Sequence, residues 1–194
     1  KLMGDICYCR DSIREPDYER AAEYYHKASQ LGSTTADYLL GDIYYYGYLG
    51  NEFSSAAEAY ERAAQNGYAP AQYTLGYLLQ NELGVACDIE KAQYWFEKAA
   101  KQGNNFSQFH LANLLLRSND KRGPDYKKAF YWMERSAKQG YGQAQRKLGE
   151  LYQFGIGCSK NTIEARIWYK KASEQGDEVA SYLLKKLENK SKKS

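Results

Sequence analysis

Proline, histidine and cysteine are scarce in this chain of 194 residues. The 3 prolines leave long segments free to form helices, because proline interrupts helix interiors. With 2 histidines and 4 cysteines, the chain is poorly supplied for a metal site. The cysteines follow neither a zinc-binding CxxC pattern nor a disulfide framework, so we expect small buried or partly exposed thiols. The sequence thus predicts no metal and no other cofactor.

Long apolar runs and a strong charge of one sign are also missing. No stretch approaches 18 consecutive apolar residues, which excludes a membrane-spanning helix. The 27 basic and 24 acidic residues leave a formal net charge of +3, too balanced for a dedicated nucleic-acid binder. The motifs GxSxG, HExxH, the P-loop and a strand-borne GxGxxG are absent. We therefore expect no enzyme, no nucleic-acid partner and no membrane span.

What the sequence does contain is one segment that recurs five times, as in the run KAAKQG at 98–103. The closing glycines lie at intervals of 35, 36, 37 and 36 residues: Gly32, Gly67, Gly103, Gly140 and Gly176. An alanine lies eleven residues before each of them. This period predicts repeats at about 1–32 (truncated), 33–67, 68–103, 104–140 and 141–176, followed by a C-terminal capping helix at 177–190.

Each repeat is predicted to form two helices, because its apolar residues follow a 3.6-residue period. In the second repeat the helices are expected at about 34–46 and 54–66. The closing glycines occupy the place of a left-handed helix end. Gly41, Gly76 and Gly149 fall inside helices, which indicates a close approach of the neighbouring helix; Ala112 takes the corresponding place in the fourth repeat. Because a lone hairpin cannot cover its own apolar face, stacked hairpins are expected.

The pattern Ala-x3-Leu-Gly-x2-Tyr, then a glycine-bearing turn, then Lys-Ala-x2-Trp-Phe-x-Lys-Ala-Ala-x2-Gly resembles the Sel-one-like repeat (SLR), a branch of the tetratricopeptide (TPR) superfamily. The best matches lie at 144–157 and 91–103, and the turns at 51–54 and 119–123 depart from the pattern. The resemblance covers nearly the whole chain. It implies one domain over 1–194 that is all-α: a right-handed superhelical α-solenoid of helix-turn-helix repeats (an α/α superhelix).

The resemblance also implies a function. Proteins of this kind act as non-catalytic scaffolds or adaptors that hold a protein or peptide partner, and a bacterial host-interaction factor is the sharper version. The alternatives are a subunit for cell-envelope or complex assembly, or a regulatory repeat domain of a larger enzyme. The chain starts at Lys1 without an initiator methionine, so we interpret it as a fragment or a processed chain. A secreted or periplasmic location is favoured over the cytoplasm.

In TPR-like superhelices the first helix of each repeat lines the concave surface, and this geometry selects candidate partner-binding residues. Positions +6 and +10 after each closing glycine lie off the core face of that helix, and +13 and +14 lie at its end. Two interpretations stay open: the aromatic rings at +6 belong to the core, or they form a ladder for a partner. The predicted residues are Tyr38, Asp42, Tyr45, Tyr46, Tyr73, Tyr77, Phe109, Asn113, Arg117, Arg146, Glu150 and Tyr182.

The same phase divides many of the 20 tyrosines into two groups. One group is expected to belong to the repeating core, and the other, given above, to the concave wall. The predicted core tyrosines are Tyr25, Tyr44, Tyr60, Tyr152 and Tyr169.

Overall fold

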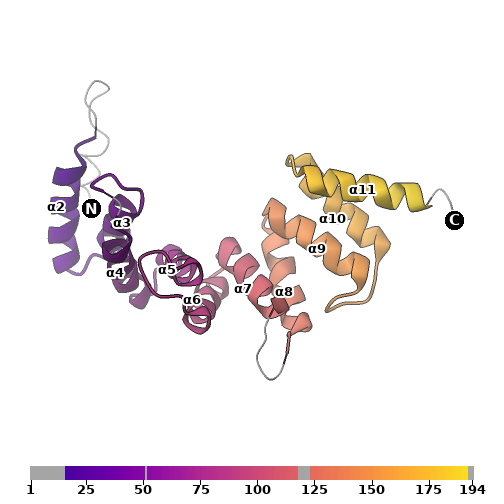
Figure 1. Ribbon diagram of the computed structural model, residues 1–194, viewed down its shortest axis with the longest axis horizontal. Helices are drawn as coiled ribbons and strands as arrows, with labels where there is room; N and C mark the ends of the chain where they lie inside the picture. Colours follow the sequence, from indigo (N-terminus) through magenta and orange to yellow (C-terminus); the bar gives the residue numbers. More distant parts are fainter. Residues whose placement is uncertain (1–15, 51, 118–122, 192–194) are drawn as a thin grey trace. The chain divides into compact units, whose positions relative to one another are not determined.

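The computed structural model describes residues 16–50, 52–117 and 123–191, and within these ranges it contains ten helices (Figure 1). No strand is present among the described residues, apart from an isolated bridge between Tyr48 and Gly50. The predicted helices at 34–46 and 54–66 are confirmed to within one residue at each end. The helices are α2 (Tyr18–Gln30), α3 (Thr34–Tyr45), α4 (Phe53–Gln65), α5 (Ala69–Asn81), α6 (Ile89–Lys101), α7 (Asn105–Arg117), α8 (Tyr126–Lys138), α9 (Gly142–Phe154), α10 (Thr162–Glu174) and α11 (Glu178–Ser191).

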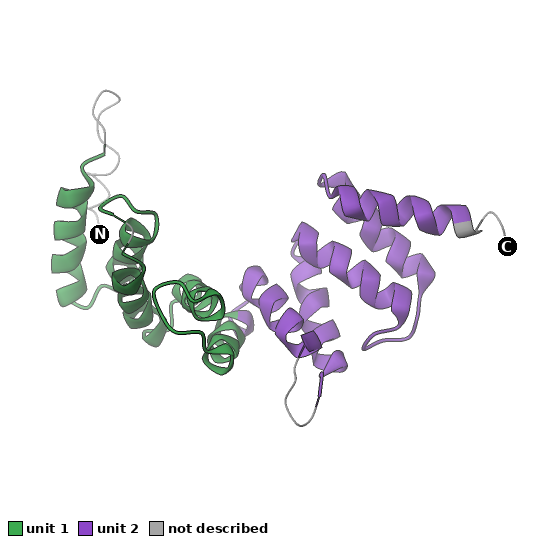
Figure 2. Cartoon of the chain, in the orientation of Figure 1, with its two compact units in different colours: residues 1–99 green, residues 100–194 purple. Residues whose placement is uncertain are grey.

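The chain divides into two compact units, residues 1–99 and 100–194 (Figure 2). In the first unit α2, α3, α4 and α5 pack in chain order, each against the next. In the second unit α7, α8, α9, α10 and α11 do the same. Helix packing between sequence neighbours is the defining property of a solenoid. The chain is therefore an all-α helical repeat solenoid.

The closing glycines adopt the left-handed backbone conformation that the sequence predicts. Their φ angles are +84°, +85°, +95°, +92° and +90° in chain order. A Cβ atom added to any of the five would meet no atom within 4 Å. The requirement for glycine is thus set by backbone conformation, which other residues rarely adopt, and not by lack of space.

The mid-helix glycines have the opposite cause. Each lies on the first helix of a repeat against an aromatic ring of the second helix. A Cβ added there would come within 2.6 to 2.9 Å of the ring, which is far below ordinary contact distance. The close approach predicted from sequence is therefore confirmed. The pairs are Gly41 with Tyr60, Gly76 with Phe96, and Gly149 with Tyr169.

In the fourth repeat, other residues form the contact between the two helices. Ala112 stands at the glycine position, and Met133 stands where the other repeats have an aromatic ring. Both side chains are fully buried in one cluster. Since methionine is slender and flexible, it leaves space for the alanine methyl group that a rigid ring would not leave.

A buried glutamine links the helices of three repeats, a feature that the sequence analysis did not identify. It lies five residues after the closing glycine, and its Nε2 donates to a backbone carbonyl at the end of the preceding helix. The bonds run from Gln72 to Ala64 O (3.1 Å), Gln108 to Ala100 O (3.1 Å) and Gln145 to Ala137 O (3.2 Å). Gln139 and Gln175 then donate to Gln108 Oε1 and Gln145 Oε1 at 2.8 Å.

The predicted core tyrosines belong to the interior to different degrees. Tyr25, Tyr60 and Tyr169 are buried. Tyr44 and Tyr152 are half-buried and pack against the core clusters of the first and second unit, respectively. Tyrosine at these places supplies apolar area to the core while its hydroxyl stays within reach of a polar partner.

Candidate functional site

Six of the predicted partner-binding residues meet at one hollow in the first unit. The hollow has a volume of about 270 Å³ and is lined by eight residues. They come from α3, from the residue that caps its C-terminal end, and from α4 and α5. Asp42 is the one charged side chain among these eight residues. The lining consists of Tyr38, Asp42, Tyr45, Tyr46, Tyr60, Tyr73, Thr74 and Tyr77. We call this site the tyrosine hollow.

The Asp42 carboxylate is held by tyrosine hydroxyls. Tyr60 Oη donates to Asp42 Oδ1 at 2.7 Å. Burial raises the pKa of Asp42, while the hydrogen bonds from Tyr60 and Tyr38 act in the lowering direction and only partly offset it. Burial, followed by the charge of Asp42, raises the pKa of Tyr38 and of Tyr60, so both phenols stay protonated and able to donate.

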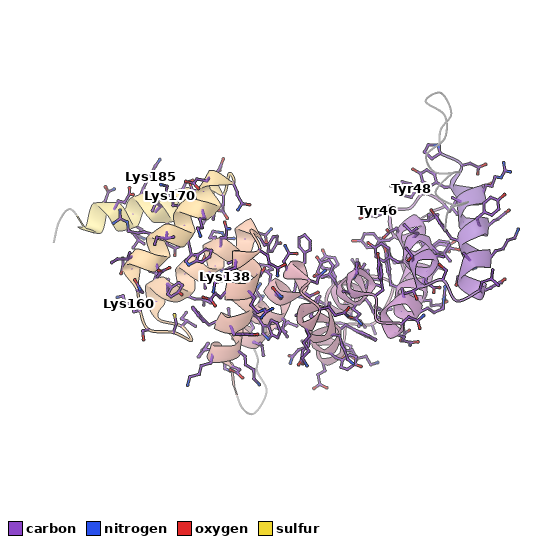
Figure 3. The ribbon with its side chains drawn as sticks, turned by 180° about the vertical axis from the view of Figure 1, so that it is seen from behind. Tyr46, Tyr48, Lys138, Lys160, Lys170 and Lys185 are labelled. Carbon is purple, nitrogen blue, oxygen red and sulfur yellow. The ribbon has the colours of Figure 1, made fainter. Side chains whose placement is uncertain are left out.

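The rings around Asp42 are packed on one side and accessible on the other. Tyr38 contacts Tyr60 at 5.5 Å between centroids and stands edge-on to Tyr68 at 5.2 Å. Tyr46 is 63% exposed and can be followed in Figure 3, close to Tyr48. The hollow therefore has a rigid floor and an exposed rim.

Tyrosines of α3 and α5 line the hollow together. Tyr45 lies on α3, and its pKa is raised by burial first and then by the nearby Tyr77 of α5 and Tyr46. Tyr73 and Tyr77 lie one helical turn apart on α5, with their centroids 6.4 Å apart. The wall is therefore formed by two consecutive repeats.

The other six predicted site residues lie in the second unit, where four of them have structural partners and two are exposed. Phe109 stands edge-on to Tyr141 at 5.1 Å and packs against the core cluster. Asn113 Nδ2 donates to the Phe109 carbonyl at 3.0 Å, so its amide is tied to its own helix. Arg117 ends α7 and is exposed.

The last three predicted residues are one ion-paired set and one exposed ring. Arg146 Nη1 lies 3.1 Å from Glu150 Oε1, and Arg146 Nε lies 2.8 Å from Asp177 Oδ2. Glu150 is also paired with Lys147 at 2.7 Å. Tyr182 is 63% exposed on α11. The ion pairs thus join four charged side chains of the second unit to one another.

The second unit also has a wider hollow of about 480 Å³ over its repeat turns. None of the predicted residues lines it. Two of its glutamine amides, Gln139 and Gln175, are already bonded to amides outside the lining, and Gln175 Nε2 also donates to Gly140 O at 3.1 Å. We take the tyrosine hollow as the candidate site, because it combines exposed aromatic area with a half-buried carboxylate. The wider hollow is lined by Asn105, Gln139, Gly140, Tyr141, Gly142, Gln143, Ala172, Gln175, Gly176 and Asp177.

Two residues of the tyrosine hollow escaped the sequence analysis. Thr74 lines it, and its hydroxyl is bonded to the Pro70 carbonyl at 3.1 Å. Tyr60 is 1% exposed and was assigned to the core, yet its hydroxyl reaches Asp42. A signal was present, because the same position carries Phe96 in the next repeat; a buried tyrosine in place of phenylalanine requires a hydrogen-bond partner.

Other predictions concern cysteines, metals and membranes. Cys87 is exposed and Cys158 is half-buried, and both are free thiols. Cys7 and Cys9 lie outside the described residues. So do residue 51 and most of 119–123, which belong to the two turns that depart from the repeat pattern. In the described ranges, no group of three or more metal-binding side chains occurs. No described helix has both the length and the apolar character needed to span a bilayer.

The repeats match a known family over most of the chain. The profile of the Sel1 repeat matches residues 2–33, 34–68, 69–104, 106–141 and 142–177. The chain belongs to the Sel1 repeat family. Proteins of this family are typically non-catalytic scaffolds that mediate protein interactions. No curated protein has a matching sequence.

Solved structures agree with this membership. A protective antigen present in uropathogenic Escherichia coli strains, which displays an SLR fold, is 32% identical with a TM-score of 0.88. A Sel1 repeat protein from Oxalobacter formigenes is 28% identical with a TM-score of 0.79. Each match covers 94% of this chain, which spans 39% and 53% of the two proteins. An immunity protein from Pseudomonas aeruginosa shares the fold alone, since it is only 21% identical with a TM-score of 0.53. That match covers 93% of this chain and 69% of the immunity protein.

Proposed function

We propose that this chain is a non-catalytic scaffold that binds a protein or peptide partner through the tyrosine hollow of its first unit. The observation that carries the proposal is the convergence of six tyrosines, five of them half-buried or exposed, around one half-buried carboxylate. Family membership supports the coarser part of the proposal, since Sel1 repeats generally mediate protein interactions.

Tyrosine suits such a surface for physical reasons. Its ring supplies a large contact area with few rotatable bonds, and its hydroxyl forms hydrogen bonds, so tyrosine is enriched among residues that dominate binding energy. The rings of Tyr38 and Tyr60 are fixed by mutual packing, so little side-chain entropy is lost when a partner binds.

For the biological setting we favour a bacterial host-interaction factor over an envelope-assembly subunit or a regulatory domain of a larger enzyme. The likeness to the Escherichia coli protective antigen supports this choice. Sequencing the complete reading frame tests it: a fused catalytic domain would favour regulation, whereas a secretion signal without one would favour the host-interaction or envelope role.

The binding proposal is tested by selecting random peptides, displayed on phage, on the immobilised full chain. Selected peptides are then titrated against wild type and a Tyr73→Ala/Tyr77→Ala variant by fluorescence anisotropy. A Tyr94→Ala/Tyr131→Ala variant is the matched control, because these two tyrosines are 51% and 48% exposed on the second helices of their repeats.

The expected result is an affinity loss of about tenfold or more for the Tyr73/Tyr77 variant, since each lost aromatic anchor removes on the order of 1–2 kcal/mol. The control variant should bind within about twofold of wild type, as expected for a near-neutral surface change. Circular dichroism must show that all three chains are folded. Failure to select any binder, or equal losses in both variants, would contradict the proposed site.

A further inference from the structure

Of the repeats that follow one of the closing glycines, two carry an acidic residue at position +10, and of these only the fifth supplies a cation for it. In the fifth repeat Arg146 at +6 lies 3.1 Å from Glu150 at +10. The same arginine bridges to Asp177, the residue that follows the next closing glycine, at 2.8 Å. One guanidinium group therefore pairs with two carboxylates, and Lys147 adds a second cation at Glu150.

In the second repeat the corresponding residues are Tyr38 at +6, Asp42 at +10 and Tyr68 after the next closing glycine. An edge-on contact of the Tyr38 and Tyr68 rings, at 5.2 Å, replaces the pair of Arg146 with Asp177. Asp42 supplies the carboxyl group at +10, but the second repeat has no equivalent of the arginine. Of the described residues, none places a cationic group within ion-pair distance of Asp42, whose interactions are with the hydroxyls of Tyr60 and Tyr38.

The fourth repeat shows that the aromatic arrangement does not itself require a carboxylate. Phe109 at +6 stands edge-on to Tyr141 at 5.1 Å, which repeats the geometry of Tyr38 and Tyr68. Its position +10 is Asn113, which is neutral. Stability of the aromatic contact thus gives no reason for a charge at Asp42.

We infer that the tyrosine hollow accepts an arginine side chain of the protein partner, whose guanidinium group pairs with Asp42 and stacks on the surrounding tyrosine rings. This inference rests on the proposed function and names the chemistry of the partner. The external arginine takes the role that Arg146 has in the fifth repeat.

The chemistry of the hollow favours arginine over other side chains. Guanidinium is planar and weakly hydrated, so it can leave water, stack on a tyrosine face and donate to a carboxylate at the same time. A lysine ammonium group is more strongly hydrated and cannot stack in this way. An acidic or apolar group would leave the half-buried Asp42 carboxylate with its tyrosine hydroxyls but without a counter-charge, which costs free energy.

The test titrates the isotopically labelled full chain with capped pentapeptides that carry a single central side chain. Nuclear magnetic resonance monitors the chemical shifts of the chain during each titration. The peptides are Gly-Gly-Arg-Gly-Gly and the same peptide with citrulline, which keeps the shape of arginine but carries no charge. Lysine and glutamate peptides complete the series. The variants are Asp42→Asn and, as the matched control of equal charge change, Glu150→Gln.

For wild type we expect the arginine peptide to bind at least fivefold more tightly than the citrulline and lysine peptides, with shifts confined to residues of the hollow. Asp42→Asn should abolish the preference for arginine over citrulline, whereas Glu150→Gln should preserve it, because Glu150 is already paired within the chain. A charge-assisted hydrogen bond accounts for a difference of about tenfold.

Equal binding of arginine and citrulline, preference for lysine, or an unchanged preference in Asp42→Asn would overturn the inference. Self-association that Asp42→Asn abolishes would also overturn it, by assigning the hollow to a second copy of the chain. Failure here is distinguishable from failure of the proposed function. If selected peptides lose affinity for Tyr73→Ala/Tyr77→Ala but contain no essential arginine, the site binds a partner and only its chemistry has been assigned wrongly.

Discussion

Replacing Gly149 with alanine places a methyl group against the buried ring of Tyr169. The new Cβ would lie 2.7 Å from Cδ1 and Cε1 of Tyr169 and 3.2 Å from the Ala165 carbonyl oxygen. Ordinary carbon contacts are about 3.5–4.0 Å, so the helices must separate by roughly 1 Å or the ring must shift by that amount. Tyr169 is fully buried, and its hydroxyl is held by Gln153 at 2.7 Å.

Two effects of the substitution oppose each other. Alanine improves the helical propensity of α9 by about 1 kcal/mol relative to glycine. Overpacking costs about 1–3 kcal/mol, and the rigid surroundings of Tyr169 favour the upper part of this range. We therefore predict that Gly149→Ala lowers the free energy of unfolding by about 1–2 kcal/mol, which corresponds to a fall in Tm of about 2–8 °C.

The fourth repeat supplies the compensating change, because Ala112 faces Met133 there. Adding Tyr169→Met to Gly149→Ala should recover part of the loss, with a favourable coupling energy of at least about 0.5 kcal/mol in the double-mutant cycle. Urea denaturation followed by circular dichroism measures all four chains. If Gly149→Ala is neutral or stabilising, or if the two changes are additive, the packing explanation of the mid-helix glycines is refuted.

Three further predictions concern buried polar groups. Gln145→Ala should lower the free energy of unfolding by about 1–3 kcal/mol, because it removes two bonds of a buried amide: the one that Gln145 donates to the Ala137 carbonyl and the one that it accepts from Gln175. Thermal denaturation measures this, and an unchanged Tm would contradict it. Asp42→Asn should be at least as stable as wild type at neutral pH. The pKa of Asp42 is raised in the folded state, so the folded chain binds more protons than the unfolded chain at pH values between the unfolded and the folded pKa. Wild type should therefore lose stability relative to the variant as the pH rises through this window. Paired urea denaturations across pH check the sign, and the opposite trend would contradict it. Tyr60→Phe should raise the pKa of Asp42 further, because it removes a hydroxyl that donates to the carboxylate. The chemical shift of the Asp42 carboxyl carbon, followed across pH, measures this pKa. A fall in the pKa would show that Tyr60 does not stabilise the charge.

The fold could be predicted from the sequence because its determinants recur. Five glycines in register marked the helix ends, and their positive φ angles are a local property that glycine alone satisfies easily. The mid-helix glycines marked close helix contacts, because only a packing constraint explains a residue that weakens the helix itself. Both kinds of signal are carried by single residues at fixed positions.

The candidate site was predictable only in part, since repeat phase gives the direction of a side chain but not its partner. Phase placed Tyr38 and Phe109 at one equivalent position, yet Tyr38 lines a hollow beside a carboxylate while Phe109 packs against the core. Phase likewise gave Arg146 as a surface residue without indicating its two ion pairs. These differences depend on distances between side chains of different repeats, which a single sequence does not specify.

The central claim, that the tyrosine hollow holds a partner's side chain, is tested most directly by intermolecular nuclear Overhauser effects between a bound arginine peptide and the full chain. The account predicts cross-peaks from the arginine side-chain protons to the ring protons of Tyr73 and Tyr77, lost when Asp42 is replaced by asparagine. Cross-peaks confined to rings of the second unit, such as Phe109 or Tyr182, would contradict it.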